Sequence, residues 1–278
     1  MTLVTCRFCL YQSFSNVFTY YSPPNGEIKF GFNTNKEYYR QIFRCDSCGH
    51  FVSVCEMEMG ELYSGDYVSS NYQDAKGIKR NFDRIISLPP SESDNANRVE
   101  GVLNFAKKQF TSSTLSKPPS LLDVGSGLAV FPYKMKEKGW NCTTLDPDIR
   151  SVEHARKVVG AKSIHADFIK VEDLGKFDMI SFNKVLEHVE DPVKMLAKSL
   201  NYIEETGFVY VEVPDGEFAM IEGKEREEFF IDHHHIFSVA SLSLLASRSG
   251  YNAKIIERLR EPSRKFTLRA YLLPNSCH

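Results

Sequence analysis

Short apolar runs alternate with helix-like stretches from Ser120 to the end of the chain, and this alternation restricts the possible folds more than any other feature. The apolar runs lie at 120–124, 141–146, 161–166, 177–183 and 207–214, and residues with helical spacing lie between most of them. Two last runs, at 251–259 and 265–273, suggest an antiparallel hairpin. Strands that alternate with helices form a mostly parallel sheet covered on both faces. We therefore expect an α/β fold.

Two cysteine pairs indicate a separate module at the N-terminus. Cys6 and Cys9 form one C-x-x-C pair, and Cys45 and Cys48 form the other. Each pair can place two thiolates about 2.3 Å from one tetrahedral zinc ion. The odd total of seven cysteines, without a secretion signal, argues against a disulfide framework and leaves redox pairs as the alternative. We predict a four-cysteine zinc site, with His50 as a reserve ligand.

These patterns divide the chain into three parts. Residues 1–72 are predicted to form a small zinc-binding module, whose stability would depend on the metal and on its many aromatic side chains. Residues 73–119 are predicted as a helical connection, with helices at 74–88 and 97–110. Residues 120–278 are predicted to hold the sheet. Within them, the acidic and basic run at 222–230 is expected to be a solvated lid or helix.

Charge and hydropathy exclude several classes of protein. No apolar run approaches the ~18–20 residues that cross a bilayer, and the N-terminal residues lack the pattern of a signal peptide. With 34 Lys and Arg against 36 Asp and Glu, the net charge of −2 argues against a large contact with a phosphate backbone. We therefore expect a cytoplasmic protein without a membrane span, and nucleic acid is not the expected partner. The oligomeric state stays open.

Polar residues follow four of the predicted strands, at the edge where open α/β sheets bind ligands. The first strand leads into Asp123-Val124-Gly125-Ser126-Gly127, and glycines in such a turn let the backbone approach a ligand closely. The second strand ends at Asp146, Asp167 follows the third, and Asn183 ends the fourth. Any single acid could simply cap a helix or face solvent. Acids at successive strand ends, however, predict a binding site.

This ordered set of motifs resembles the class I S-adenosylmethionine-dependent methyltransferases of the small-molecule type, over residues 120–273. The resemblance implies a Rossmann-like sheet of seven strands with an antiparallel last strand, and S-adenosylmethionine as cofactor. It also implies roles for six residues at the strand ends: Gly125 and Gly127 beside the methionine part, Asp123 facing its amino group, Asp146 on the ribose, Asp167 on the adenine, and Asn183 near the transferred methyl. Ala129 stands where many members of the family have glycine.

A narrower resemblance covers nearly the whole chain. The two distant cysteine pairs, a tyrosine-rich stretch at 62–72 and the segment Val211–Pro214 are similar to nucleotide-sugar C-methyltransferases with an N-terminal zinc-binding domain. Those enzymes have Tyr-His-Glu-His where this chain has Asp232-His233-His234-His235. His235 and His188 match histidines of the family, whereas the tyrosine and the glutamate are not matched. The C-terminal domain of that family has no counterpart in this sequence.

The two matched histidines are therefore predicted to form the acid–base side of the acceptor pocket, although His188 could instead be a packing residue at a helix start. The expected activity is methyl transfer to oxygen or carbon of a small polar acceptor, a sugar or nucleotide-sugar. Two alternatives stay open: a zinc-ribbon methyltransferase acting on RNA, and a non-enzymatic zinc-ribbon interaction protein with a relic methyltransferase domain. The intact residues at the strand ends argue against the relic.

Overall fold

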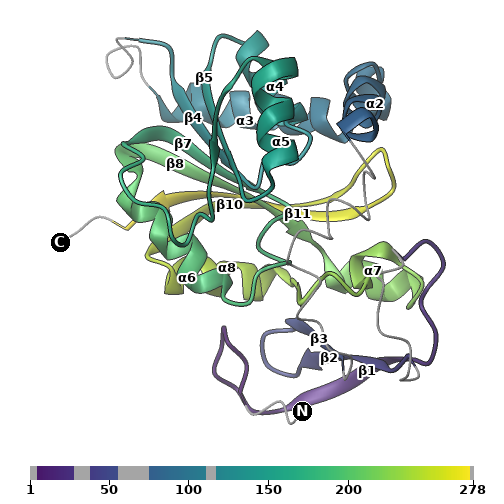
Figure 1. Ribbon diagram of the computed structural model, residues 1–278. Helices are drawn as coiled ribbons and strands as arrows, with labels where there is room; N and C mark the ends of the chain where they lie inside the picture. The colour runs from purple at the N-terminus through teal and green to yellow at the C-terminus, as the bar shows by residue number, and fades with distance from the viewer. Residues whose placement is uncertain (1–4, 28–37, 56–74, 111–116, 276–278) are drawn as a thin grey trace.

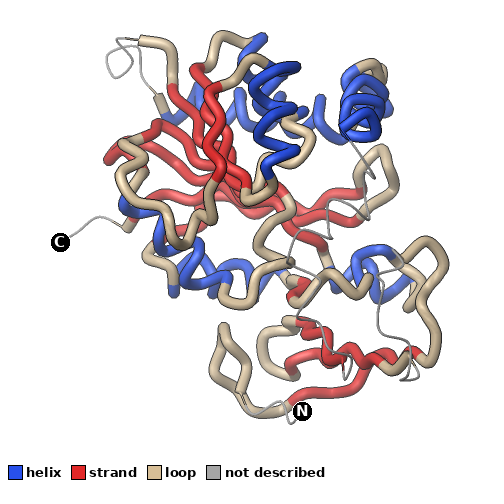
Figure 2. Tube along the Cα trace, viewed as in Figure 1, coloured by secondary structure: helices blue, strands red, loops and turns tan. Residues whose placement is uncertain are grey.

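A seven-stranded sheet forms the centre of the C-terminal part of the molecule (Figures 1 and 2). The structure is a computed structural model that describes residues 5–27, 38–55, 75–110 and 117–275. The strands are β4 (Ser120–Val124), β5 (Asn141–Asp146), β6 (Lys162–His165), β7 (Phe177–Asn183), β8 (Ile203–Pro214), β10 (Tyr251–Arg260) and β11 (Phe266–Pro274). Their order is β10-β11-β8-β7-β4-β5-β6, and β11 is antiparallel to both of its neighbours. The predicted α/β sheet is confirmed.

Helices cover both faces of this sheet (Figure 1). One face carries α3 (Asp94–Gln109), α4 (Val130–Glu137) and α5 (Ile149–His154), with α2 (Ala75–Ile86) outside α4 and α5; the other carries α6 (Pro192–Lys198) and α8 (Val239–Arg248). The first face buries Val102 of α3 and Phe131 of α4, and the second buries Leu196 of α6 and Leu242 of α8. Among the described helices, none is both long and apolar enough to cross a membrane.

The N-terminal part of the chain, which carries the two cysteine pairs, forms a second sheet, and this sheet is antiparallel. Its strands β1 (Phe14–Tyr20), β2 (Arg40–Cys45) and β3 (Phe51–Cys55) come from the N-terminus, but its fourth strand, β9 (His235–Ile236), comes from the C-terminal part. The small zinc-ribbon-like unit is thus confirmed as a fold, and β9 is an addition that the sequence did not reveal. The tyrosine-rich stretch at 62–72 lies outside the described residues.

The small sheet packs directly on the turn that follows β8. There α7 (Gly216–Glu222) begins with a glycine, and a Cβ atom on Gly216 would lie 2.5 Å from the Phe51 ring of β3. The charged run at 222–230 agrees with expectation in its first part, where Glu222, Lys224 and Glu225 are exposed. Its second part differs, because Glu228 and Phe229 are only 2% and 0% exposed. Arg40 of β2 donates a hydrogen bond to the Phe229 carbonyl oxygen at 2.5 Å, so the N-terminal sheet covers this segment.

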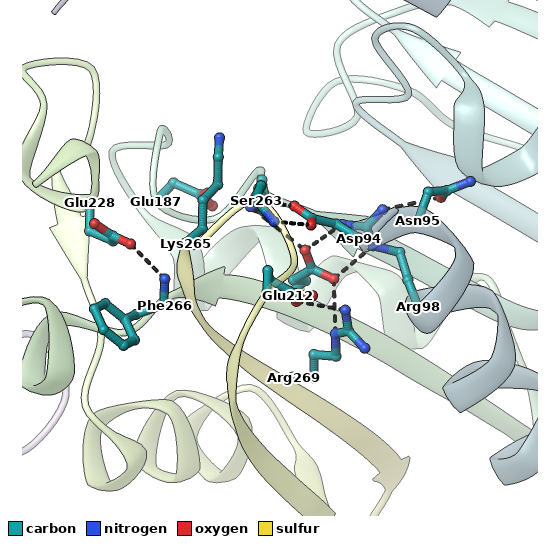
Figure 3. Close-up of polar contacts among 12 residues, drawn as sticks. Asp94, Asn95, Arg98, Glu187, Glu212, Glu228, Ser263, Lys265, Phe266 and Arg269 are labelled. Carbon is teal, nitrogen blue, oxygen red and sulfur yellow. Dashed lines mark hydrogen bonds and ion pairs between the residues drawn. The ribbon is translucent and has the colours of Figure 1, made fainter. Parts of the chain in front are cut away.

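A buried carboxylate joins several elements behind the carboxyl ends of the central strands (Figure 3). Glu212 of β8 is 0% exposed and receives two hydrogen bonds from the Arg98 guanidinium of α3, at 2.7 and 2.5 Å. Arg269 of β11 and Lys184 lie 3.4 and 3.8 Å from its oxygens. Burial alone would raise the pKa of Glu212, but these cations, Arg98 foremost, hold it well below its usual value. The carboxylate therefore stays ionised.

We expect Glu212→Gln to destabilise the fold strongly, because it leaves buried cations without their counter-charge. Removing one partner of a buried ion pair costs about 3–5 kcal/mol. Asp83→Asn is the matched control, since it breaks the exposed Lys79–Asp83 pair and should cost less than about 1 kcal/mol. Urea unfolding at neutral pH measures both. A Glu212→Gln protein as stable as the control would show that the cations are compensated elsewhere.

Candidate active site

The carboxyl ends of the parallel strands bring several predicted residues together. Between β4 and β7 the strand order reverses direction, and ligands bind at such a switch point. The Asp146 carboxylate at the end of β5 accepts a hydrogen bond from the Gly127 amide at 2.8 Å. The Asp123 carboxylate in β4 accepts from the Asn183 side chain in β7 at 3.2 Å. Three neighbouring strand ends thus form one polar site.

The loop after β4 has the shape of a ligand cradle. Gly125 and Gly127 have φ angles of +67° and +49°, in the left-handed region that favours glycine. A Cβ atom on Gly125 would lie 2.7 Å from Val185, so this position has no room for a side chain. At Gly127, no atom of the described residues apart from its two chain neighbours lies within 4 Å of the Cβ position, so that side of the loop is open. Ala129 also adopts the left-handed conformation, with φ +54°, although it is not glycine.

Burial controls the charge of the two acids at this loop. It raises the pKa of Asp123 to about 7, against the opposing effect of hydrogen bonds from Ser181 and Asn183. Burial also raises the pKa of Asp146, which two amide donors, Gly127 and Asp148, counteract. Each Asp146 oxygen accepts one of these amides, at 2.8 Å in both cases, and keeps a second lone pair. Asp146 can therefore order the loop and still accept hydrogen bonds from a ligand.

Asp167 lies at the same edge, beyond β6. The Ala166 amide donates to the Asp146 carbonyl oxygen at 3.2 Å, so Asp167 follows directly after a contact with β5. Its carboxylate accepts from the Ile169 amide at 2.9 Å and lies 3.4 Å from Lys170. The side chain is 42% exposed and borders the edge from the solvent side. The structure therefore places Asp167 beside the other predicted acids, where it also stabilises its own turn.

A carboxylate that the sequence reasoning missed lies just after β7. Glu187 is 1% exposed, and its Oε2 has no hydrogen-bond partner among the described residues. Burial raises its pKa to about 7; nearby His188 and Lys184 lower it, and Asp232 raises it further. A buried carboxyl group that titrates near neutral pH is typical of acid–base sites. The only signal in the sequence was an acid immediately before the predicted His188.

His188 belongs to the same cluster. Its Nδ1 lies 2.8 Å from the carbonyl oxygen of Asp232 and therefore donates, which directs Nε2 toward the Glu187 carboxylate, 4.0 Å away. The His233 ring lies across that of His188, with 4.9 Å between centroids. Donor atoms of Glu187, His188 and His233 all lie within 4.8 Å of one another. The cluster thus gathers one buried carboxylate and two imidazoles in a single polar group.

The second predicted histidine has different partners. His235 lies in β9, is 5% exposed, and its Nδ1 is 3.0 Å from Nε2 of His50. Its Nε2 lies 3.5 Å from the Glu190 carbonyl oxygen. Burial lowers the pKa of His235 to about 4, so the imidazole is neutral at physiological pH. The structure therefore turns His188 toward Glu187 and His235 toward the N-terminal sheet.

The four predicted cysteines meet in one cluster. Sγ of Cys6 lies 3.6 Å from Sγ of Cys48, and Sγ of Cys9 lies 3.4 Å from Sγ of Cys45. A tetrahedral zinc site with 2.3 Å bonds places its sulfurs about 3.8 Å apart, whereas a disulfide needs about 2.05 Å. The geometry and the soft donor set fit zinc. His50 stays outside this set and contacts His235 instead.

The two knuckles have the same backbone form. The Leu10 amide donates to the Cys6 carbonyl oxygen and the Gly49 amide to that of Cys45, both at 3.0 Å. Both turn residues have positive φ angles, +63° at Leu10 and +71° at Gly49. Leucine adopts this conformation at a cost of roughly 1–2 kcal/mol, which a metal crosslink can offset.

Comparison with known proteins agrees with this arrangement. A family model described as a methyltransferase domain matches residues 97–254, more than half of the chain. A ubiquinone biosynthesis O-methyltransferase from Erwinia tasmaniensis is 24% identical over 161 residues, which are 55% of this chain and 60% of that protein. Its counterpart from Caulobacter vibrioides is 24% identical over 128 residues, 42% of this chain and 51% of the relative. The chain thus matches between half and two thirds of the length of these relatives.

Solved structures share the fold at low identity. The 1,6-didemethyltoxoflavin-N1-methyltransferase of Burkholderia thailandensis, with bound 1,6-didemethyltoxoflavin and S-adenosylhomocysteine, has a TM-score of 0.56 at 15% identity and covers 90% of this chain and 100% of its own. The magnesium protoporphyrin IX methyltransferase of Synechocystis, with bound SAH, has a TM-score of 0.56 at 13% identity and covers 77% of this chain and 100% of its own. The family match and the strand order lead to one conclusion: the chain belongs to the family of methyltransferase domains.

Proposed function

We propose that the chain is an S-adenosylmethionine-dependent methyltransferase that acts on a small polar acceptor. The observation that carries the proposal is the meeting of the glycine loop, Asp123, Asp146 and Asn183, with the buried Glu187 four residues after Asn183 in the chain. The similarity of the zinc module to sugar enzymes favours a sugar or nucleotide-sugar, methylated at oxygen or carbon. The names of the curated relatives favour a second candidate, the hydroxyl of a ubiquinone-type precursor.

The roles that we assign to residues at the cofactor are those that the resemblance to class I methyltransferases implies. The open side of the loop at Gly127 leaves room for the methionine part, Gly125 lies in the same turn, and ionised Asp123 is assigned to the ammonium group of the cofactor. Asp146 accepts hydrogen bonds from the ribose hydroxyls, and Asp167 from the adenine amino group. Asn183 is assigned to the neighbourhood of the transferred methyl, as the family resemblance implies. When bound, S-adenosylmethionine supplies an electrophilic methyl group on a sulfonium.

Proton removal is assigned to the Glu187–His188 pair. The bound cofactor would supply the methyl carbon to the acceptor oxygen or carbon, and its sulfur would keep the electron pair of the sulfur–carbon bond. Glu187 takes up the proton that the acceptor loses, so its carboxylate becomes neutral. Nε2 of His188 is directed toward that carboxylate and stabilises this change of charge. The protein otherwise acts by holding donor and acceptor in line. His235 contributes to this side of the site through its main chain, because its amide donates to the Glu187 carbonyl oxygen.

The N-terminal module completes the proposal. We assign one zinc ion to Cys6, Cys9, Cys45 and Cys48, since their sulfurs have tetrahedral spacing. Free thiols in such a cluster suit the reducing cytoplasm, where we place the protein. The balanced charge of the whole chain makes RNA the weaker alternative as an acceptor.

Binding of S-adenosylhomocysteine should release protons from Asp123. Because burial raises its pKa to about 7, much of the carboxyl group is protonated near pH 6.5, and a ligand ammonium favours the ionised form. Affinity should therefore rise with pH from about 6 to 8. Calorimetry in buffers of different ionisation enthalpy measures the release. Asp123→Asn should reduce it, whereas Asp146→Ala should weaken binding at every pH. Equal affinity of Asp146→Ala and wild type would remove the ribose assignment.

Glu187→Gln should lower turnover by ~10²–10⁴, because the amide keeps the shape but cannot take a proton. Turnover of wild type at saturating cofactor should fall as pH drops through about 7, where Glu187 becomes protonated. A labelled-methyl transfer assay against nucleotide-sugar and phenolic pools, with RNA as control, tests both. Glu190→Gln, an exposed acid three residues on, is the matched control. Full turnover of Glu187→Gln on the identified acceptor would leave catalysis to positioning alone.

Purified protein should carry one zinc per chain. The double change Cys45→Ser with Cys48→Ser should release it and deprotect the N-terminal sheet, since a module this small depends on the metal. Cys55→Ser, in the same sheet but outside the cluster, should retain the metal. Elemental analysis after dialysis gives the stoichiometry. Metal-free wild type with four readily alkylated thiols would refute the site.

A further inference from the structure

The strand β9 connects the cysteine cluster to the acceptor side of the site. In the small sheet, Phe51 pairs with Ile236 and Val52 with His235. The Ser53 amide donates to the His234 carbonyl oxygen at 3.2 Å. Strand pairing gives β3 and β9 a common rigid frame. The main chain around residues 234–236 is therefore held from the N-terminal side.

Two side-chain contacts reinforce this link beside the metal-binding knuckle. Nε2 of His50 lies 3.0 Å from Nδ1 of His235, and both rings are buried. The Ser238 hydroxyl donates to the Cys48 carbonyl oxygen at 2.5 Å. Phe8, from the other knuckle, packs against the His50 ring with 4.4 Å between centroids. His50 comes only two positions after Cys48 of the cluster, and its ring contacts His235 of β9 directly.

A second anchor holds the start of the same segment. Arg40 of β2 is 0% exposed, lies over the Tyr20 ring at 4.4 Å and pairs with Glu27 at 3.0 Å. Arg40 donates to the Phe229 carbonyl oxygen, and Glu27 accepts from the Ile231 amide at 2.8 Å. Residues 229–236 are therefore fixed to the N-terminal sheet near both ends.

The opposite side of this segment carries the acid–base cluster. The amides of His234 and His235 both donate to the Glu187 carbonyl oxygen, at 2.8 and 3.2 Å. The Asp232 carbonyl oxygen accepts from His188. Any displacement of residues 232–235 would therefore move the backbone of Glu187 and the ring of His188. Asp123 and the glycine loop make none of these contacts, among the residues that the structure describes.

We propose that His50 is a positioning residue, through which the occupied cysteine cluster holds residues 229–236 and thereby Glu187 and His188 in place. Loss of the metal would free the two knuckles, release His50 from His235, and loosen the acceptor side while the cofactor side stays ordered. The description of Glu187 and His188 as the acceptor side rests on the proposed methyltransferase function. The mechanical link itself rests on the contacts alone.

Hydrogen exchange with mass spectrometry on the full chain tests the link. Zinc removal by a chelator should increase exchange at residues 230–238 at least about tenfold and leave β4, β5 and β7 unchanged. His50→Phe keeps the aromatic packing but loses the hydrogen bond, so it should increase exchange at 230–238 with zinc still bound. His50→Gln, whose amide can donate to His235, should restore protection. Thr19→Ala, on the far strand β1, is the matched control and should have no effect.

Two further measurements separate the outcomes. His235→Phe removes the same hydrogen bond from the other side and should reproduce His50→Phe. S-adenosylhomocysteine affinity should stay within about twofold in all of these proteins, because the cofactor side has no contact with His50 among the described residues. Unchanged exchange at 230–238 after zinc removal, or in both His50→Phe and His235→Phe, would overturn the proposal. Absence of any S-adenosylhomocysteine binding, with the exchange result intact, would instead refute the proposed function.

Discussion

The ion pair of Glu212 with Arg98 is the interaction on which the arrangement of the site depends. It joins β8 to α3, and it draws in Arg269 of β11 and Lys184 just after β7 (Figure 3). In the sheet, Glu212 lies beside Asn183, the last residue of β7. A buried carboxylate with excess positive charge around it has few alternative positions, since separating the charges costs several kcal/mol. The polypeptide that continues from β7 to Glu187 and His188 therefore leaves the sheet at a fixed point.

Around that fixed point, burial assigns different tasks to similar side chains. Glu212 stays ionised because cations surround it, whereas burial brings the pKa of Asp123 and Glu187 to about 7. A group that titrates near neutral pH can exchange its proton when a charged ligand or a reacting atom arrives. The two acids lie on different sides of the β4–β7 switch, one toward the glycine loop and one toward the histidines. In the proposed function, this separation gives the cofactor to Asp123 and the acceptor to Glu187.

The N-terminal sheet includes one strand, β9, from the C-terminal part of the chain that also forms the seven-stranded sheet. β9 has only two residues, too few to be stable alone, and its pairing with β3 depends on the surrounding buried contacts. Arg40, Glu27 and His50 supply those contacts from the N-terminal side. Through these contacts the N-terminal sheet reaches residues 229–236, whose His234 and His235 amides donate to the Glu187 carbonyl oxygen.

Local signals in the sequence determined the elements of the catalytic part. The runs at 120–124, 141–146 and 177–183 became β4, β5 and β7 with the same bounds, because buried parallel strands are continuous apolar runs ended by polar residues. The positive φ angles at Gly125 and Gly127 agree with a close backbone approach, which the glycine pattern indicated. The spacing of the cysteines likewise predicted the cluster. The strand and glycine signals act within a few residues of the features that they predict, and each cysteine pair marks its own knuckle.

The tertiary structure decided everything that depends on contacts across long distances in the chain. Only packing could show that His235 faces His50, that Glu187 is buried beside His188, and that Glu212 is neutralised by Arg98. A histidine or a glutamate has the same pattern in a sequence whether it is buried or exposed, since its pKa and its partners come from other elements. The strand β9 was hidden for the same reason: two residues carry no periodicity, and their partner strand lies far away at the other end of the chain.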